Sequence, residues 1–418
     1  MTDLPVEPES VVYPVLTEPA GGIPDLVDTP AALERTISAL AAGQGPVSID
    51  TERAHGFRYR AKAYLIQVRR AGAATHLIDP IALEPEQQIA DLSGLSAALG
   101  EAEWILHAAS QDLPCLVEVG MVPTQLFDTE LAARLLGIPK VNLGALTEEA
   151  LGISLLKQHS AADWSRRPLP EDWLAYAALD VERLHDLQDW LTERLELAGK
   201  LDWARQEFDY LVAHATDPHP GVADPWRRTS GLHAVHSSLG LAIVRELWTV
   251  RDSLAAAQDK APGRILNDRA ISELAVKLEQ SRAAPTRSEL RTVRGFVMRA
   301  AARYENVWLD AVGTALALPK QELPPRHVEQ SGPPQPRSWE HRWPDSFKRW
   351  SRVRPALVER AESLEVPVEN LIAPDVVKRL LWEAPASISP TALEDRLTEL
   401  GAREWQRTLV APTILAHW

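Results

Sequence analysis

The run VSIDTER at residues 47–53 is an apolar β-strand that ends in two acidic side chains. Because side chains alternate along a strand, Asp50 and Glu52 point to the same face of the sheet. Two adjacent carboxylates repel each other unless a cation neutralises them, and such oxygen ligands suit Mg²⁺ or Mn²⁺. By itself, however, a D-x-E tripeptide is also typical of a solvated strand end.

The segments around this run predict an α/β domain. Three further β-rich runs follow it: AYLIQVRR (63–70), ATHLID (74–79) and EWILHA (103–108). The first two are joined by connections too short for a crossover helix, so they should extend VSIDTER into an antiparallel meander, whereas later strands, separated by helices, should be parallel. We therefore expect a mixed sheet flanked by helices.

Prolines, glycines and changes of periodicity divide the rest of the chain. We expect these parts: a disordered leader (1–25), the α/β domain (26–215), a small all-α unit (232–312), a proline-rich linker (313–344) and a second helical unit (345–418).

Composition narrows the function classes. The formal net charge is −14, yet residues 1–215 hold 33 acids against 16 bases, while residues 216–418 hold 28 bases against 25 acids. This asymmetry favours a carboxylate site in the first half and a module that grips nucleic acid in the second. Cys115 is the single cysteine, so no internal disulfide can form, and no run is long and apolar enough to span a membrane. A cytoplasmic protein is expected.

Two later motifs carry further acids. In WILHAASQDLPCL (104–116), a strand runs into a helix with Asp112 in its first turn, where the helix dipole favours a carboxylate. In LPEDWLAYAALDVERLHDL (169–187), Tyr176 and Asp180 lie one helical turn apart on one face. A phenol in that position could hold or deprotonate an attacking water beside a metal ligand, as two-metal phosphodiester hydrolysis requires.

The order of these motifs, together with flanking segments such as HAASQDL and DWSRRPL, resembles the ribonuclease D branch of the DEDD exonucleases, in the subgroup with a tyrosine in the third motif. The resemblance implies a ribonuclease-H-like sheet. It also implies that two divalent cations are held by Asp50, Glu52, Asp112 and Asp180, and that Tyr176 positions the nucleophilic water. One ion would activate that water and the other would stabilise the leaving 3′-oxygen. Many relatives have Glu where this chain has Gln111, a change that alters no ligand.

Arginines supply the predicted contacts to nucleic acid. Arg166 and Arg167 precede the third-motif helix, where they could hold a substrate phosphate or form structural salt bridges. Arg287, Arg291 and Arg294 would share one face of a helix, either as a phosphate track or as a merely solvated face.

The helical units also resemble known modules. LAIVRELWTVRDSLAAAQDKAPGRILNDRAISELA (241–275) resembles an HRDC domain, which in this family is thought to bind nucleic acid, and residues 345–418 weakly resemble a second copy. Three tryptophans near the start of that second unit could stack bases or close a core, and we favour the core: Trp339, Trp343 and Trp350.

The resemblance implies a 3′-to-5′ exoribonuclease acting on single-stranded RNA 3′ ends, with tRNA precursors as the substrate class. A DNA exonuclease is the alternative enzyme. An inactive nucleic-acid-binding scaffold is the alternative from another class, although the complete set of carboxylates argues against it.

Overall fold

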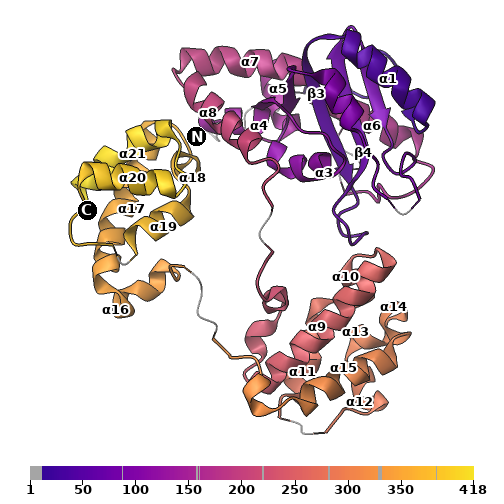
Figure 1. Ribbon diagram of the computed structural model, residues 1–418, viewed down its shortest axis with the longest axis vertical. Helices are drawn as coiled ribbons and strands as arrows, with labels where there is room; N and C mark the ends of the chain where they lie inside the picture. The colour runs from indigo at the N-terminus through magenta and orange to yellow at the C-terminus, as the bar shows by residue number, and fades with distance from the viewer. Residues whose placement is uncertain are drawn as a thin grey trace, which may run out of the picture.

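The computed structural model describes residues 12–86, 88–156, 159, 161–218, 221–280, 283–327, 332–382 and 384–418. None of the helices within these ranges is long and apolar enough to cross a membrane. Figure 1 shows three parts: a sheet domain, a helical unit beside the β3–β4 end of the sheet domain, and a second helical unit against α8.

The first part is built on a six-stranded mixed sheet in the order β2-β5-β4-β3-β6-β7. Its strands are β2 (Leu26–Val27), β3 (Gln44–Arg53), β4 (Ala63–Ala71), β5 (Ala74–Ile78), β6 (Glu103–Leu106) and β7 (Gln125–Asp128). β3, β4 and β5 pair antiparallel, whereas β3, β6 and β7 pair parallel. The predicted meander and mixed sheet are confirmed.

Helices cover both faces of this sheet, because alternate residues of its central strands are apolar on both sides. On β4, Leu65 packs toward α6 in one cluster, and the next residue, Ile66, packs in the larger cluster on the other face. The helices of this part are α1 (Pro30–Ala42), α2 (Ser93–Leu99), α3 (Leu113–Glu118), α4 (Thr129–Leu135), α5 (Leu143–Leu151), α6 (Glu171–Glu182), α7 (Leu184–Leu197) and α8 (Leu201–Ala213).

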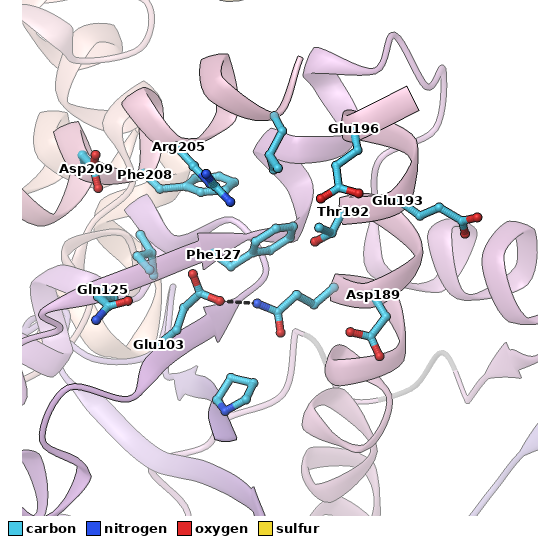
Figure 2. A pocket seen from close by; sticks show the side chains of 14 residues that line it. Glu103, Gln125, Phe127, Asp189, Thr192, Glu193, Glu196, Arg205, Phe208 and Asp209 are labelled. Atoms are coloured by element: carbon cyan, nitrogen blue, oxygen red, sulfur yellow. Dashed lines mark hydrogen bonds between the residues drawn. The ribbon is translucent and has the colours of Figure 1, made fainter. Parts of the chain in front are cut away.

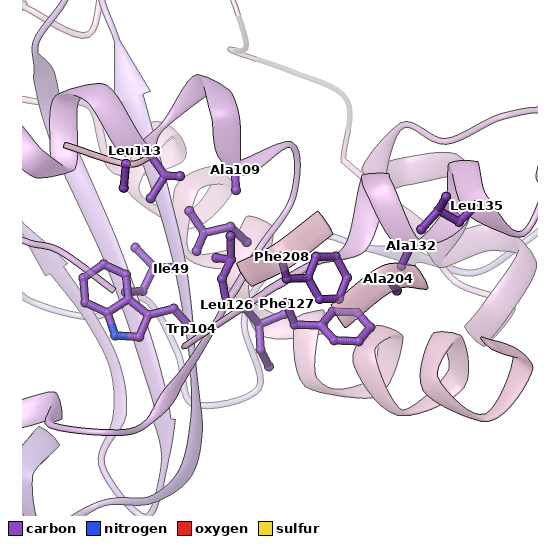
Figure 3. Packing of buried hydrophobic residues seen from close by; sticks show 14 of the residues in the cluster. Ile49, Trp104, Ala109, Leu113, Leu126, Phe127, Ala132, Leu135, Ala204 and Phe208 are labelled. Carbon is purple, nitrogen blue, oxygen red and sulfur yellow. The ribbon is translucent and has the colours of Figure 1, made fainter. Parts of the chain in front are cut away.

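Aromatic packing joins β7, the edge strand of the six-stranded sheet, to the last helix of the domain. Phe127 of β7 meets Phe208 of α8 with ring centroids 4.9 Å apart (Figure 3). This contact holds α8 against the edge of the sheet.

The expected leader differs from the structure in part. Residues 1–11 lie outside the described ranges, but β1 (Val15–Leu16) pairs parallel with β8 (Ser154–Leu155), and the backbone N–H of Ala20 donates to Glu182. Parts of residues 12–25 therefore contact the domain. The strand pairing satisfies hydrogen-bonding groups of the backbone, and a proline-rich composition gives no sign of such pairing.

The second part is an all-α unit with its own core, in which α9 packs against α11 and α15. Its helices are α9 (Ser238–Gln258), α10 (Pro262–Ile265), α11 (Asp268–Leu278), α12 (Arg287–Arg291), α13 (Arg294–Val297), α14 (Arg299–Ala302) and α15 (Glu305–Ala317). Arg251 is buried and donates to the Leu266 carbonyl and to Asp268, so it fastens the turn between α10 and α11.

The third part contains α16 (Trp339–Arg342), α17 (Pro344–Ser363), α18 (Val368–Leu371), α19 (Pro374–Leu381), α20 (Pro390–Glu399) and α21 (Glu404–Ala416). This part begins earlier than predicted, because Trp339 is fully buried in its core. The ring centroids of Trp339 and Trp350 are 5.7 Å apart. Helix α15 also extends into the expected linker, as far as Ala317. The favoured packing role of the tryptophans is confirmed, since Trp339 is buried and Trp343 and Trp350 pack against the same core. Burial of these rings orders a stretch that its prolines alone would predict to be a linker.

Candidate active site

Three acidic side chains converge at the carboxyl ends of the parallel strands. Asp50 and Glu52 come from the end of β3, and Asp180 comes from α6. One carboxylate oxygen of each lies within 4.8 Å of the others. Such a spacing lets a single cation contact all three.

Asp112 lines the same cavity, at the start of α3, and a hydroxyl fixes its orientation. Thr51, which lies between the two acids of β3, donates to Asp112 Oδ1 at 2.6 Å. Arg53 Nη2 is 3.9 Å from the same oxygen. The strand therefore supplies two acids directly and holds a third through its threonine.

Burial gives these acids unusual protonation behaviour. Burial, and then the neighbouring carboxylates, raise the pKa values of Asp50 and Glu52 well above their ordinary range. Burial raises the pKa of Asp112 to about 6 and that of Asp180 to about 7. A group of like charges kept out of water is stabilised by a bound cation, so an all-oxygen donor set of this kind fits a hard divalent ion.

Tyr176 also lines the cavity, one turn before Asp180 on α6, and its hydroxyl forms a hydrogen bond with Asp180. Burial, and then the charge of Asp180, raise the pKa of this phenol above its ordinary value. The hydroxyl therefore remains protonated near neutral pH. It can orient a water molecule or a substrate oxygen more readily than it can remove a proton.

Asp128, a buried acid at the end of β7, positions the segment that leads to Asp112. Its carboxylate accepts from the backbone N–H groups of Ala108 and Ala109 at 3.1 and 2.8 Å, and also caps α4. Ala108 has a positive φ of 61°. The short 3₁₀ turn η1 (Ala109–Gln111) is thereby fastened between β7 and α3.

The cavity lies where the carboxyl ends of the strands meet, and its volume is about 700 Å³. A second cavity of about 620 Å³ lies at the opposite, amino ends of the strands, near Glu103 and Gln125 (Figure 2). There Gln188 donates to Glu103, and none of the predicted ligands is present. The catalytic candidates therefore belong to the first cavity alone.

Several residues of the site were missed from sequence. Arg53 donates to the Gln111 carbonyl at 2.6 Å and to its side-chain oxygen at 3.2 Å. Lys140 and Asn142 are exposed on the cavity rim, in the loop between α4 and α5. The position of Arg53, directly after Glu52, was a usable signal. The sequence around Lys140 held no such signal, because only the tertiary structure brings its loop to the site.

The two arginines predicted to hold a phosphate have different surroundings in the structure. Arg167 makes paired hydrogen bonds to the buried Asp79, both at 2.7 Å, and also donates to backbone carbonyls of Tyr64 and Trp164. Its guanidinium is fully engaged within the protein, so the structural salt bridge is the alternative that holds. Arg166 is exposed, and no side-chain partner is found for it in the described ranges.

The predicted arginine face of the helical unit is also corrected. Arg287 and Arg291 lie on α12, but the chain leaves the helix at Val293, which is extended and buried, and Arg294 begins α13. Arg291 pairs with Glu305 at 2.7 Å, and Arg287 lies 3.7 Å from the same carboxylate. Burial of Val293 breaks the helical spacing, and Glu305 partly neutralises the charge.

Comparison with known proteins identifies the family. Residues 24–196 match a model described as 3′-5′ exonuclease, residues 240–312 match the HRDC domain, and residues 332–418 match the 3′ to 5′ exonuclease C-terminal domain. Ribonuclease D of Gluconacetobacter diazotrophicus is 32% identical over 322 residues, which are 75% of this chain and 77% of that protein. The chain belongs to the ribonuclease D family. The predicted enzyme class, a 3′-to-5′ exoribonuclease of the ribonuclease D type, is confirmed by this membership.

Solved structures share the ribonuclease D architecture. A protein from Bifidobacterium adolescentis is 38% identical, with a TM-score of 0.87 over 97% of this chain and 99% of that chain. Escherichia coli RNase D is 24% identical, with a TM-score of 0.64 over 90% of this chain and 98% of that chain, which shows a common fold. The predicted ribonuclease-H-like exonuclease fold followed by a helical HRDC domain is confirmed. The interpretation of residues 345–418 as a second HRDC copy stays a prediction.

Proposed function

We propose that this protein removes nucleotides from the 3′ ends of single-stranded RNA and releases nucleoside 5′-monophosphates. The observation that carries the proposal is the buried group of carboxylates whose pKa values are raised, at the carboxyl ends of the strands. Such a group is costly to fold without a ligand of opposite charge. Its donors suit two divalent cations, Mg²⁺ or Mn²⁺, with Asp50, Glu52, Asp112 and Asp180 as ligands.

When bound, the cations would lower the pKa of a water ligand and neutralise charge that develops on the leaving oxygen. The protein's own side chains do the rest. Tyr176, kept protonated by its surroundings, orients the attacking water toward the terminal phosphorus. The bond from phosphorus to the 3′-oxygen of the preceding nucleotide breaks, and the released nucleotide keeps its 5′-phosphate.

Two exposed basic side chains, one on the cavity rim and one just before α6, supply contacts for the substrate backbone. Lys140 on the rim and Arg166 before α6 are exposed, and no protein acceptor is found for either side chain in the described ranges. We assign both to substrate phosphates. Arg294 remains a weaker candidate for the same role in the helical unit.

The physiological substrate class that we propose is tRNA precursors, in the cytoplasm. The solved Escherichia coli neighbour is described as an exoribonuclease involved in structured RNA processing. A reaction confined to 3′ ends in structured precursors fits the combination of a carboxylate site with additional helical units.

The test is digestion of single-stranded RNA labelled at the 3′ or the 5′ end, beside matched DNA, with Mg²⁺, Mn²⁺ or chelator. We expect mononucleotides from the 3′ end, faster cleavage of RNA than of DNA, and no product in chelator. Asp50→Asn keeps the size of the side chain but removes a charged ligand, so activity should fall by more than about a hundredfold. Undiminished activity in this variant, folded normally by circular dichroism, would exclude the metal mechanism.

A further inference from the structure

The loop of residues 54–62, between β3 and β4, joins the exonuclease domain to the HRDC domain. The Phe57 carbonyl accepts from the backbone N–H of Ala261 at 3.0 Å, and the Gly56 carbonyl accepts from Arg264 Nε at 2.6 Å. The Tyr59 hydroxyl also donates to Asp252 at 2.9 Å. These hydrogen bonds hold the turn between α9 and α10 against the loop (Figure 1).

A cavity of about 340 Å³ opens at this junction, and both domains contribute cations to it. Its lining is Phe57, Arg58, Asp163, Lys260 and Arg264. Three positive side chains thus face one carboxylate, in a protein whose net charge is −14. Asp163 accepts a hydrogen bond from the Ser165 hydroxyl, and within the described ranges no ion pair joins it to these basic side chains.

Two of these basic side chains have hydrogen-bond donors that no protein group in the described ranges accepts. Lys260 is exposed, and within the described ranges its ammonium has no protein partner. Arg264 uses only Nε in its contact with Gly56, while its guanidinium lies over the Phe57 ring at 3.9 Å. Arg58 is more constrained, since it donates to Ser165 at 2.7 Å and lies 3.7 Å from Asp259. The Lys260 and Arg264 donors remain free to hold an anion.

The junction lies close to the catalytic cavity along the chain. Phe57 is five residues after Glu52, a distance of at most ~18 Å for a fully extended backbone. A polyanion whose 3′ end occupies the carboxylate site has its next few phosphates within this reach. The arginines of α12, which pair with Glu305, are less available for such contacts.

We propose that the cavity between the 54–62 loop and the α9–α10 turn binds backbone phosphates of the RNA strand upstream of its 3′ end. Lys260 and Arg264 of the HRDC domain are the principal phosphate donors, with Arg58 of the exonuclease domain beside them. This inference rests on the proposed exonuclease function. It gives the HRDC domain a defined role, because the domain completes a site that neither part of the chain forms alone.

The test compares Lys260→Gln with wild type on a dinucleotide and on a longer single-stranded RNA. A dinucleotide fills only the catalytic cavity, so its kcat/KM should be unchanged. On the longer RNA, KM should rise about fivefold with kcat unchanged, and the dependence of log affinity on log salt should lose about 0.7 of slope, as expected for one lost contact to a single strand. Lys320→Gln, which removes an exposed charge of the same helical region outside the cavity, is the matched control and should match wild type.

The outcomes separate the two proposals. If wild type cleaves neither RNA, the proposed function fails. If wild type cleaves both and Lys260→Gln shows the same KM and salt slope on longer RNA, the phosphate site is wrong while the exonuclease stands. An equal loss on dinucleotide and longer RNA would also overturn the site, because it would show a general defect of the domain junction. Longer DNA should compete through the same cavity, since phosphates are common to both polymers.

Discussion

Tyr176 and Asp180 show how one helical turn sets the chemistry of a side chain. The hydroxyl and the carboxylate share a hydrogen bond, and burial raises the pKa values of both groups. The phenol is therefore kept neutral beside the carboxylates of the site. Its catalytic value lies in orientation, because a protonated hydroxyl cannot serve as the base.

Replacing Tyr176 with Phe should lower kcat by about a hundredfold or more, since the water loses its orienting partner while the ring packing remains. The ring meets Trp164 and His159, and Phe preserves these contacts, so the thermal midpoint should change little. Steady-state kinetics on labelled RNA, beside a thermal melt, checks both expectations. A kcat equal to that of wild type would remove Tyr176 from the mechanism.

The acids of the site also predict how stability depends on pH. The folded pKa values of Asp112, about 6, and of Asp180, about 7, exceed the ordinary value of about 4 for an aspartate. A raised pKa means that the folded state holds its protons more tightly. The resulting stabilisation is complete below about pH 4 and is lost as the pH rises through 6 to 7.

Divalent cations should reverse that loss, because they bind the deprotonated acids of the folded state. We expect Mg²⁺ or Mn²⁺ to raise the thermal midpoint at about pH 8 and to change it little at about pH 5. Melts with and without metal at both values are the measurement. An equal shift at both values, or an undiminished shift in Asp50→Asn, would contradict a metal site formed by these carboxylates.

At the level of elements, the connection into α6 depends on one internal ion pair. Asp79, which follows β5, is 1% exposed and receives both guanidinium hydrogen bonds of Arg167. Arg167 also ties the connection to the Tyr64 carbonyl on β4. The pair therefore holds the segment that delivers Tyr176 and Asp180 to the site.

Arg167→Gln should destabilise the protein by about 3 kcal/mol, because it leaves a buried carboxylate without its counter-charge. The neighbouring Arg166→Gln is the matched control: we expect unchanged stability and weaker RNA binding. Denaturant unfolding of the two variants, with RNA affinity measured in parallel, distinguishes the roles. Comparable stability losses in both would show that the assignment of the two arginines is wrong.

At the scale of the whole molecule, the C-terminal helices are packed on the exonuclease domain. Arg403 makes paired hydrogen bonds to Glu207 of α8, both at 2.7 Å, and Trp405 donates to the same carboxylate at 2.8 Å. The rings of Trp203 and Trp405 stack 5.0 Å apart. Buried residues of the exonuclease domain and of the C-terminal helices belong to one continuous hydrophobic cluster. These helices are therefore packed as one unit with the exonuclease domain.

Glu207→Gln should loosen this docking, because the glutamine cannot accept both charged donors, at a cost of about 2 kcal/mol. We expect a lower thermal midpoint and a larger radius of gyration in small-angle X-ray scattering. Glu196→Gln, an exposed acid on α7, should leave both measurements unchanged. A Glu207→Gln protein as compact and stable as wild type would mean that apolar packing alone holds the interface.

The sequence by itself determined the mixed sheet and two of the residue pairs that line the site at the carboxyl ends of its strands. A strand of period two places Asp50 and Glu52 on a common side, and a helix of period 3.6 does the same for Tyr176 and Asp180. That these two pairs belong to one site followed only from the resemblance to the ribonuclease D family. The spacing could not reveal that Val293 breaks the predicted arginine face, because its burial depends on the core of the helical unit. Nor could it assign different roles to the adjacent Arg166 and Arg167.

Only the tertiary structure decided which partners the basic side chains meet and which parts of the chain contact one another. It paired Arg167 with Asp79, brought Lys140 to the cavity rim, and placed Lys260 and Arg264 beside the loop that follows Glu52. These partners are distant along the chain, and no periodic pattern links them. Their proximity follows from the packing of whole elements, because a charged side chain on a surface gains a function only from what folding places next to it.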